Sequence, residues 1–334
     1  MSAKIRWGIL STALWNKALI GPLQQSARSE LAAVASRNLK KAQAYAEEKG
    51  IPKAYGSYEE LLADSEIDVV FVPLPNALHC EWTVKAAAAG KHVLCEKPLV
   101  ITMDQMEKIE AAAQANNVTI FEAVGILHHP LTHKVKEIVQ AGKLGEIQQI
   151  TAWRGFCLPP EDRDNIRLKP ELGGGSLWDV GVYPNALAIL LNQTGPPIEV
   201  WACQIKGETG VDLTMSGQMR FSNGVVAQIS SSLSTPDRAR LHIAGNKGAL
   251  EVMAPSMPVN TGRTDSQIVI SGIDGNTETV VIPARDAYLC EVEAMEACVL
   301  DGAAPIVPLS LSRDFLKSIL ALYQSANSGR PVKL

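Results

Sequence analysis

A lysine next to a proline follows a short apolar segment in the first third of the chain. Lys97 and Pro98 come after residues 91–94, which read as a β-strand that leaves a turn at Gly90. In a parallel sheet, a lysine at the carboxyl end of a strand faces the crevice where ligands bind. Its ammonium group can stabilise a substrate oxygen or exchange a proton with it. The simplest interpretation of Lys97 alone is a solvated surface lysine. A catalytic role therefore depends on which other residues lie near it.

An aspartate and a tyrosine four residues apart form a second candidate pair. Asp179 and Tyr183 follow a glycine triplet at 173–175, and the spacing predicts that both lie on one face of a helix. An ammonium group near Tyr183 would favour the phenolate and make this tyrosine a proton donor and acceptor. Asp179 would hold Lys97 or bind a substrate hydroxyl. The alternative is an aspartate near a helix start and a half-buried tyrosine without chemistry.

The first strand and helix, residues 5–10 and 14–26, are joined by a short turn of small residues. A dinucleotide pyrophosphate needs small residues and backbone amides at such a helix start. Ser11 and Ala13 stand where glycines are expected, so the motif is not G-x-G-x-x-G and is weak by itself. The hydroxyl groups of Ser11 and Thr12 are able to bind phosphate.

The residues after the second predicted strand, 31–35, indicate which dinucleotide is bound. An acid at this point binds the ribose 2′-hydroxyl of NAD, but the chain has Ser36, Arg37 and Asn38. A hydroxyl and a guanidinium suit the 2′-phosphate of NADP, although NAD stays open. The alternative is a surface arginine that caps the next helix.

Three histidines, His128, His129 and His133, lie close together in the sequence. The spacing of four between His129 and His133 would suit a metal ion, but no carboxylate or thiol stands at ligand spacing, so we predict no metal site. We expect His129 to line a substrate cleft and His133 to lie on the surface. Arg154 and Trp178 are the other candidate substrate residues.

Short strands alternate with helices over residues 1–124. The strands are predicted at 5–10, 31–35, 67–72, 93–95 and 119–124. This alternation predicts a Rossmann domain with a parallel, doubly wound sheet. From residue 125 the apolar period changes to two. The strands predicted there are 148–155, 198–205, 214–221, 225–232, 239–245, 249–253, 267–271 and 277–282. We therefore predict a second, α+β domain over 125–334 with one large, open, mainly antiparallel sheet.

The composition bears on partners and location. The 334 residues are 46% hydrophobic and 20% charged, with a net charge of −4, which fits a globular protein without a basic surface for nucleic acid. No apolar run is long enough for a transmembrane helix, and the start has no signal-peptide pattern. The six cysteines form no C-x-x-C pair, as in proteins of a reducing compartment. We expect a cytoplasmic protein that contacts neither nucleic acid nor membrane.

Five segments spread over nearly the whole chain carry a family resemblance. They are residues 7–13, 51–61, 90–98, 173–183 and 328–332. Together they resemble the glucose–fructose oxidoreductase/inositol dehydrogenase (Gfo/Idh/MocA) family. The combination of Glu96-Lys97-Pro98 with Asp179-x-x-x-Tyr183 is highly specific. The branch that looks most similar contains dimeric dihydrodiol dehydrogenases and xylose dehydrogenases.

This resemblance implies an oxidoreductase that uses NADP or NAD on a sugar, a cyclitol or a related diol. It also implies that the open sheet often forms the interface of a homodimer or tetramer. Lys97 is then the catalytic or substrate-orienting lysine, Tyr183 the proton-transfer residue and Asp179 its partner. The residues that match cofactor contacts are Ser11, Thr12, Ala13, Leu14, Trp15, Ser36, Arg37, Pro73, Leu74, Asn76, His79, Glu96 and Lys97.

Two departures from the family pattern leave alternatives open. The glycine-rich turn is degenerate and is followed by the bulky Trp15 and Asn16. Ile126 and Leu127 stand where relatives carry an aromatic residue and an arginine, which changes one wall of the pocket. A catalytically inactive, cofactor-binding regulator or scaffold of the same fold is therefore the alternative to an enzyme. A third interpretation is an enzyme that retains its cofactor and recycles it between two sugars.

Overall fold

The computed structural model describes residues 4–334 except residues 160, 163 and 254–263. Its packing divides the chain into two compact units, residues 1–125 with 286–312 and residues 126–285 with 313–334. The first unit thus includes a segment from far along the chain, with helix α8 (Ala287–Asp301). This return could not be predicted from the sequence, because α8 has the same periodicity as any other buried helix.

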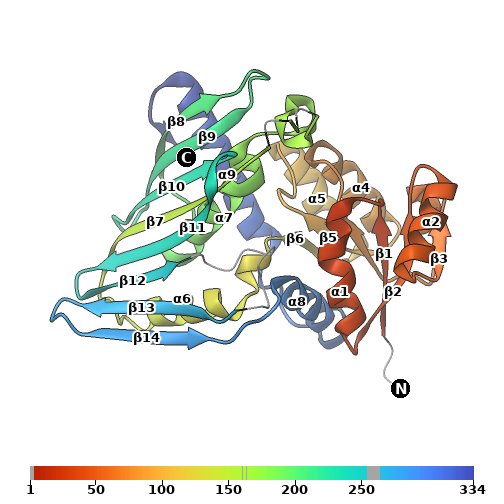
Figure 1. The fold of residues 1–334 in the computed structure, drawn as a ribbon, viewed down its shortest axis with the longest axis horizontal. Coiled ribbons are helices and arrows are strands. Elements are labelled where there is room, and N and C mark those ends of the chain that lie inside the picture. The colour runs from red at the N-terminus through yellow and green to blue at the C-terminus, as the bar shows by residue number, and fades with distance from the viewer. Residues whose placement is uncertain (1–3, 160, 163, 254–263) are drawn as a thin grey trace. The chain divides into compact units, whose positions relative to one another are not determined.

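The first unit contains a six-stranded sheet in the order β3-β2-β1-β4-β5-β6, with β3 at one edge (Figure 1). The strands are β1 (Ile5–Leu10), β2 (Ser29–Ala35), β3 (Lys53–Tyr55), β4 (Val69–Val72), β5 (His92–Glu96) and β6 (Ile120–Ala123). All neighbouring pairs are parallel, which confirms the predicted sheet. The short strand β3 was not predicted, since three half-buried residues make no apolar run.

Helices connect these strands. They are α1 (Lys17–Gln25), α2 (Leu39–Lys49), α3 (Tyr58–Ala63), α4 (Asn76–Ala88) and α5 (Met103–Asn116). Strand β4 is buried along its whole length, as expected for a strand covered on both faces. The strand order reverses between β1 and β4. The crevice in which such a sheet binds its ligand therefore lies at the carboxyl ends of these strands.

The second unit contains a nine-stranded sheet in the order β14-β13-β12-β11-β7-β10-β9-β8-β15 (Figure 1). Its strands are β7 (Ile147–Cys157), β8 (Glu199–Lys206), β9 (Asp212–Arg220), β10 (Val226–Ser232), β11 (Ser234–Gly245), β12 (Gly248–Met253), β13 (Ser266–Gly272), β14 (Thr277–Ile282) and β15 (Val332–Lys333). β7 and β10 are parallel, and the other neighbours are antiparallel. The predicted mainly antiparallel sheet is confirmed.

Helices cover one face of this sheet. The helices of the unit are α6 (Pro130–Gln140), α7 (Val182–Leu191) and most of α9 (Leu309–Ser328). Helix α7 packs on β7 and β10, and Leu322 of α9 lies close to Gly217 of β9. Buried and exposed residues alternate along β9 and β10. This alternation is typical of an antiparallel sheet with one face on a core.

Candidate active site

The turn after β1 holds a serine in a conformation that favours glycine. Ser11 has a φ of 131°, which is strained for a residue with a side chain. Its N–H donates to the carbonyl oxygen of Ala35 at 3.0 Å, and its Oγ accepts from the N–H of Ala13 at 3.2 Å. The buried Asn16 donates from Nδ2 to the carbonyl oxygen of Ser11 at 2.8 Å. These contacts hold the turn in a shape that glycine adopts without strain.

Trp15 connects this turn to the end of β5. Its Nε1 donates to Oε1 of Glu96 at 2.9 Å. Its ring lies edge-to-face on that of Tyr288 in α8, with 6.3 Å between the centroids. Leu14, by contrast, is 90% exposed. The bulky Trp15 thus links two strand ends, and Tyr288 is a neighbour that the sequence did not reveal.

The residues after β2 keep a guanidinium at the surface. Ser36 is buried and donates its N–H to the carbonyl oxygen of Tyr55 at 3.1 Å. Helix α2 is capped by Asn38, whose Oδ1 accepts from the N–H of Lys41 at 3.1 Å. Arg37 is exposed and does not make this cap. It lies beside the carboxyl end of β2, which is where Rossmann domains bind the adenosine ribose.

Residues 73–75 join β4 to α4, and the first turn of α4 contains His79. His79 is fully buried. Its Nδ1 lies 2.7 Å from the carbonyl oxygen of Pro98, and its Nε2 lies 2.7 Å from that of Leu74. Burial lowers the pKa of His79. The imidazole therefore connects the segment after β4 to the residue after Lys97, and a direct contact with a cofactor stays a prediction.

Lys97 directly follows β5, at the carboxyl edge of the parallel sheet. It is half-buried, and its peptide bond to Pro98 is cis. On the neighbouring strand β6, Oε1 of Glu122 accepts from the N–H of Leu99 at 3.0 Å. Burial raises the pKa of Glu122. The backbone around Lys97 is thus fixed on a buried scaffold, where an ammonium group can act on a ligand in the crevice.

In the second unit, Asp179 and Tyr183 lie where two kinds of helix meet. Residues Leu177–Gly181 form a π-helical turn, and α7 starts at Val182. Such turns are frequent at functional sites. The sequence predicted an ordinary helix here, because apolar spacing does not distinguish a single π turn. Tyr183 is 5% exposed, and Asp179 accepts a hydrogen bond from Nε of Arg167 at 2.6 Å.

The glycine triplet before this turn allows a close approach of other groups. A Cβ at Gly174 would lie 2.5 Å from the carbonyl oxygen of Arg167, and a Cβ at Gly175 would lie 2.2 Å from Oδ1 of Asp212. Burial raises the pKa of Asp212. The donors to its carboxylate are Oγ of Ser176 at 2.7 Å, the N–H of Leu177 at 2.8 Å and the hydroxyl of Tyr323 at 2.7 Å. Asp212 therefore anchors the start of the π-helical turn.

The three candidate substrate residues all have partners within the second unit. His129 is 2% exposed and caps α6, because its Nδ1 accepts a backbone N–H of the first turn. Arg154 is buried and pairs with Asp237. The ring of Trp178 packs on Tyr323, with 5.4 Å between the centroids. These contacts give each side chain a structural role, and its contact with a substrate stays a prediction.

A small hollow beside Tyr183 contains one of the residues that depart from the family pattern. Ile126 and Tyr183 line it, together with side chains from β7, α7 and β11. Ile126 and Leu127 are both buried. Packed aliphatic side chains therefore take the places of the expected aromatic residue and arginine.

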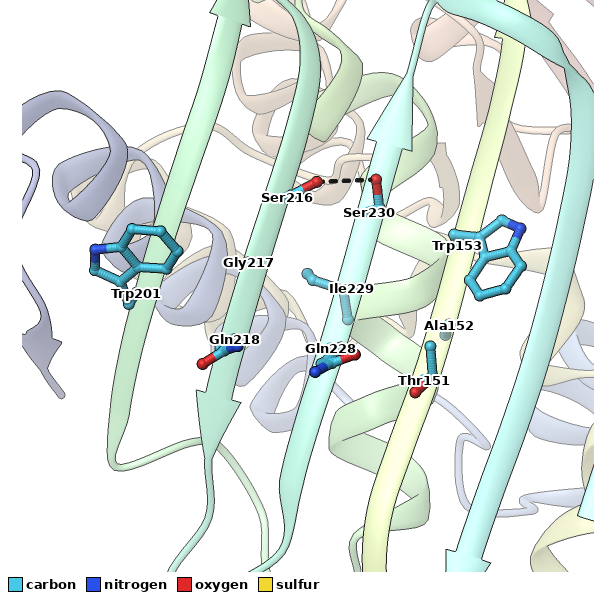
Figure 2. A pocket seen from close by; sticks show the side chains of 10 residues that line it. All are labelled: Thr151, Ala152, Trp153, Trp201, Ser216, Gly217, Gln218, Gln228, Ile229 and Ser230. Atoms are coloured by element: carbon cyan, nitrogen blue, oxygen red, sulfur yellow. Dashed lines mark hydrogen bonds between the residues drawn. The ribbon is translucent and has the colours of Figure 1, made fainter. Parts of the chain in front are cut away.

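The open face of the nine-stranded sheet carries a groove across β7, β8, β9 and β10 (Figure 2). Trp201 and Trp153 lie at its two sides, and Trp201 is 42% exposed. Between them the strands present hydroxyl and amide groups, and the Oγ atoms of Ser216 and Ser230 are 3.3 Å apart. The groove is a second candidate surface, suited to a partner with both apolar and polar groups.

Within residues 4–334 as described, no group of three or more histidine, cysteine, aspartate and glutamate side chains is placed to hold a metal ion. The same part of the chain has no helix both long enough and apolar enough to cross a membrane.

A doubly wound sheet of this strand order, with a cation after β2 and a lysine after β5, is typical of a domain that binds a dinucleotide. Two family models match the chain. The model of the oxidoreductase family with an NAD-binding Rossmann fold matches residues 5–124, and the model of the GFO/IDH/MocA C-terminal domain matches residues 132–251. The chain belongs to the Gfo/Idh/MocA family of NAD(P)-dependent oxidoreductases, which confirms the resemblance.

Known proteins resemble the chain over almost its full length. A D-xylose 1-dehydrogenase (NADP(+)) of Haloferax volcanii is 38% identical over 98% of this chain and 99% of its own. An aldose–aldose oxidoreductase of Caulobacter crescentus, solved with glycerol, has a TM-score of 0.90 at 26% identity and covers 99% of this chain and 100% of its own. A 3-ketoreductase of Actinomadura kijaniata, solved with NADP and TDP-benzene, has a TM-score of 0.88 at 28% identity, with 96% and 98% covered. An inactive regulator receives no support from these relatives.

Proposed function

We propose that this oxidoreductase transfers a hydride between NADP(H) and a carbinol or carbonyl carbon of an aldose, a cyclitol or a related diol. The relatives support this substrate class, since one is named a xylose dehydrogenase and another an aldose–aldose oxidoreductase. The observation that carries the proposal is the placement of Lys97 directly after β5, at the carboxyl edge of the sheet. This edge is where doubly wound sheets bind their ligands.

The proposed chemistry divides between the cofactor and the side chains. A bound nicotinamide supplies the hydride chemistry. Tyr183 exchanges the proton of the substrate hydroxyl, and Lys97 stabilises the charge that develops on the reacting oxygen. Asp179 orients the substrate. His129, Arg154 and Trp178 are proposed as further substrate contacts.

The groups around the carboxyl edge of the first unit fit NADP. The backbone amides after Ser11 suit the pyrophosphate, because they begin a helix. Ser36 and the exposed Arg37 suit the 2′-phosphate. The remaining proposed cofactor residues are Thr12, Ala13, Leu14, Trp15, Pro73, Leu74, Asn76, His79, Glu96 and Lys97.

A titration followed by nicotinamide fluorescence tests the cofactor. We expect NADPH to bind more tightly than NADH. Arg37→Gln should weaken NADPH about tenfold or more, because a charged hydrogen bond contributes roughly 1.5–3 kcal/mol, and should leave NADH unchanged. Lys40→Gln is the control, since Lys40 is an exposed cation three residues away. Equal binding of both dinucleotides would contradict the role of Arg37.

A rate assay with D-xylose and NADP+ tests the reaction, with other aldoses and diols assayed in parallel. Lys97→Met and Tyr183→Phe should each lower kcat by a factor of about 10²–10⁴, the usual range for lost charge stabilisation and lost proton transfer in catalysis. NADPH affinity should change by less than about threefold in Tyr183→Phe, which lies outside the Rossmann unit. A wild-type protein that binds NADPH but converts none of these substrates would refute the proposal.

A second candidate function is an oxidoreductase that retains its cofactor and passes the hydride from one sugar to another. The full-length likeness in fold to the aldose–aldose oxidoreductase favours it. The purified protein would then release stoichiometric nicotinamide on denaturation and would convert a mixture of two aldoses without added cofactor. A cofactor-free preparation that needs added NADP+ would exclude it.

We also propose that the groove on the open sheet face receives a second copy of this chain. The face combines exposed apolar side chains, Trp201, Ile205 and Val226, with the hydroxyl and amide groups of Figure 2. Light scattering of the eluting protein should give a dimer or a tetramer, and Trp201→Asp should shift it to monomer. Ile273→Asp, on the turn between β13 and β14, should leave it unchanged. A wild-type monomer would contradict this assignment.

A cytoplasmic location is proposed on the cysteines. None of the six forms a disulfide, as expected in a reducing compartment. Fractionation of the producing cells should find the protein with cytoplasmic markers, and recovery from an oxidising compartment would overturn the proposal.

A further inference from the structure

Arg167 is a partner of the Asp179 side chain within the second unit. Its Nε donates to Oδ2 of Asp179 at 2.6 Å. The arginine side chain is 31% exposed and the aspartate side chain only 14% exposed. Solvent-exposed ion pairs contribute little, but a mostly buried carboxylate loses more when its partner is removed. This pair is therefore different from the surface ion pairs of the protein.

The backbone of Arg167 is held independently of its side chain. Its N–H donates to Oδ1 of Asn165 at 3.0 Å, and its carbonyl oxygen accepts from the N–H of Gly175 at 2.9 Å. Since a Cβ at Gly174 would lie 2.5 Å from that oxygen, the glycine triplet is what lets the two segments approach. The position of Arg167 next to the π-helical turn is thus built into the fold.

The guanidinium group also lies near an aromatic ring. It lies 5.7 Å from the ring centroid of Phe156 at the end of β7, within the range of a cation–π contact. A planar guanidinium that contacts both a ring and a carboxylate has fewer alternative positions than one in solvent. The group that binds the Asp179 carboxylate is therefore itself restrained by a second contact.

We infer that Arg167 is a positioning residue for the reaction, which holds the Asp179 carboxylate in the orientation that receives a substrate hydroxyl. The inference rests on the proposed function of Asp179. Correct orientation of a substrate is a large part of enzymatic rate enhancement, so displacement of this carboxylate should lower the rate without any change in cofactor binding.

The test compares Arg167→Gln and Arg167→Lys with wild type, first in the assay with D-xylose, or the best aldose found, and NADP+. We expect Arg167→Gln to raise KM and to lower kcat/KM about tenfold or more. Arg167→Lys should recover part of this loss, because it restores the charge without the planar geometry. NADPH affinity should stay within about twofold in both. The control is Lys169→Gln in the same loop, whose nearest carboxylate is 3.9 Å away, at Asp164, and which should leave all values unchanged.

A double-mutant cycle with Asp179→Asn separates positioning from a purely structural ion pair. If Arg167 acts through Asp179, the double variant has the kcat/KM of Asp179→Asn alone. Additive losses in kcat/KM, or a coupling seen in thermal unfolding but not in kcat/KM, would overturn the inference. An inactive wild-type protein would instead refute the proposed function, so the two failures are distinguishable.

Discussion

Two turns of this protein hold a residue at nearly the same backbone angle but use different amino acids. Ser11 in the first unit has a φ of 131°, and Gly175 in the second unit has a φ of 126°. Both turns come just before a helical segment that carries proposed site residues. One turn has lost the glycine that its family pattern expects, and the other has kept it.

The difference lies in the space around the missing or present Cβ. At Gly175 a Cβ would lie 2.2 Å from the Asp212 carboxylate. This carboxylate is buried and hydrogen-bonded, so it is not a flexible surface side chain that can move aside. At Ser11 the Cβ is accommodated, and Asn16 and Ala13 bond to the strained residue. Glycine thus has two uses, conformational freedom and lack of volume. Hydrogen bonds to neighbours can replace the first but not the second.

Gly175→Ala should have the largest effect. The added methyl group overlaps Asp212 and also forces an alanine into a φ range that it rarely adopts, so we expect a loss of at least ~3 kcal/mol in the free energy of unfolding. Urea unfolding followed by circular dichroism measures it. The matched control is Gly210→Ala, where φ is also positive, at 86°, but no heavy atom lies within 4 Å of the added Cβ. Its loss should be only about 1 kcal/mol. Equal losses would mean that volume is not what preserves Gly175.

Asp212→Asn should have the next largest effect, because it breaks the anchor of the glycine-containing turn. The carboxylate accepts two hydrogen bonds at Oδ2 and one at Oδ1, whereas the amide has an NH2 group in place of one of these oxygens and cannot accept there. We expect a loss of about 2–3 kcal/mol, as for a buried hydrogen-bond network that is broken on one side. Asp274→Asn is the control, since Asp274 lies in an exposed turn, and it should change the unfolding midpoint much less. A similar shift in both variants would remove Asp212 from this role.

The two turns also differ in how far they could be predicted from the sequence. Periodicity predicted both sheets, and the strand predicted at 5–10 is found there as β1. The predicted elements also placed Ser11 and the glycine triplet in turns that come before a helix. Periodicity could not reveal Asp212 and Arg167 as partners of the glycine triplet, because these contacts join residues without a repeating pattern. The π-helical turn and the return of α8 to the first unit were missed for the same reason.

Asn16→Ala should have a moderate effect, because it breaks the anchor of the serine turn. It removes the partly buried hydrogen bond to the Ser11 carbonyl oxygen, which should reduce the free energy of unfolding by about 1–2 kcal/mol. The strained turn should then relax, and NADPH affinity measured by fluorescence should fall. Gln24→Ala, a change in an exposed side chain of α1, the helix that Asn16 precedes, is the control. Unchanged NADPH affinity in Asn16→Ala would show that the turn does not need this anchor.

The smallest effects are expected at Ser11 itself, and they isolate the strain. Ser11→Ala keeps the Cβ but loses the hydrogen bond from the N–H of Ala13, while Ser11→Gly loses both the Cβ and that bond. Alanine normally makes a protein more stable than glycine by roughly 0.5–1 kcal/mol, through the entropy of the unfolded chain. At a φ of 131° the order should reverse, with Ser11→Gly more stable by about 1 kcal/mol, because strain at such a position costs of order 1–3 kcal/mol. Thermal unfolding of the two variants side by side measures the difference directly. If Ser11→Ala proves the more stable, the serine turn is unstrained, and its likeness to the turn at Gly175 is one of angle alone.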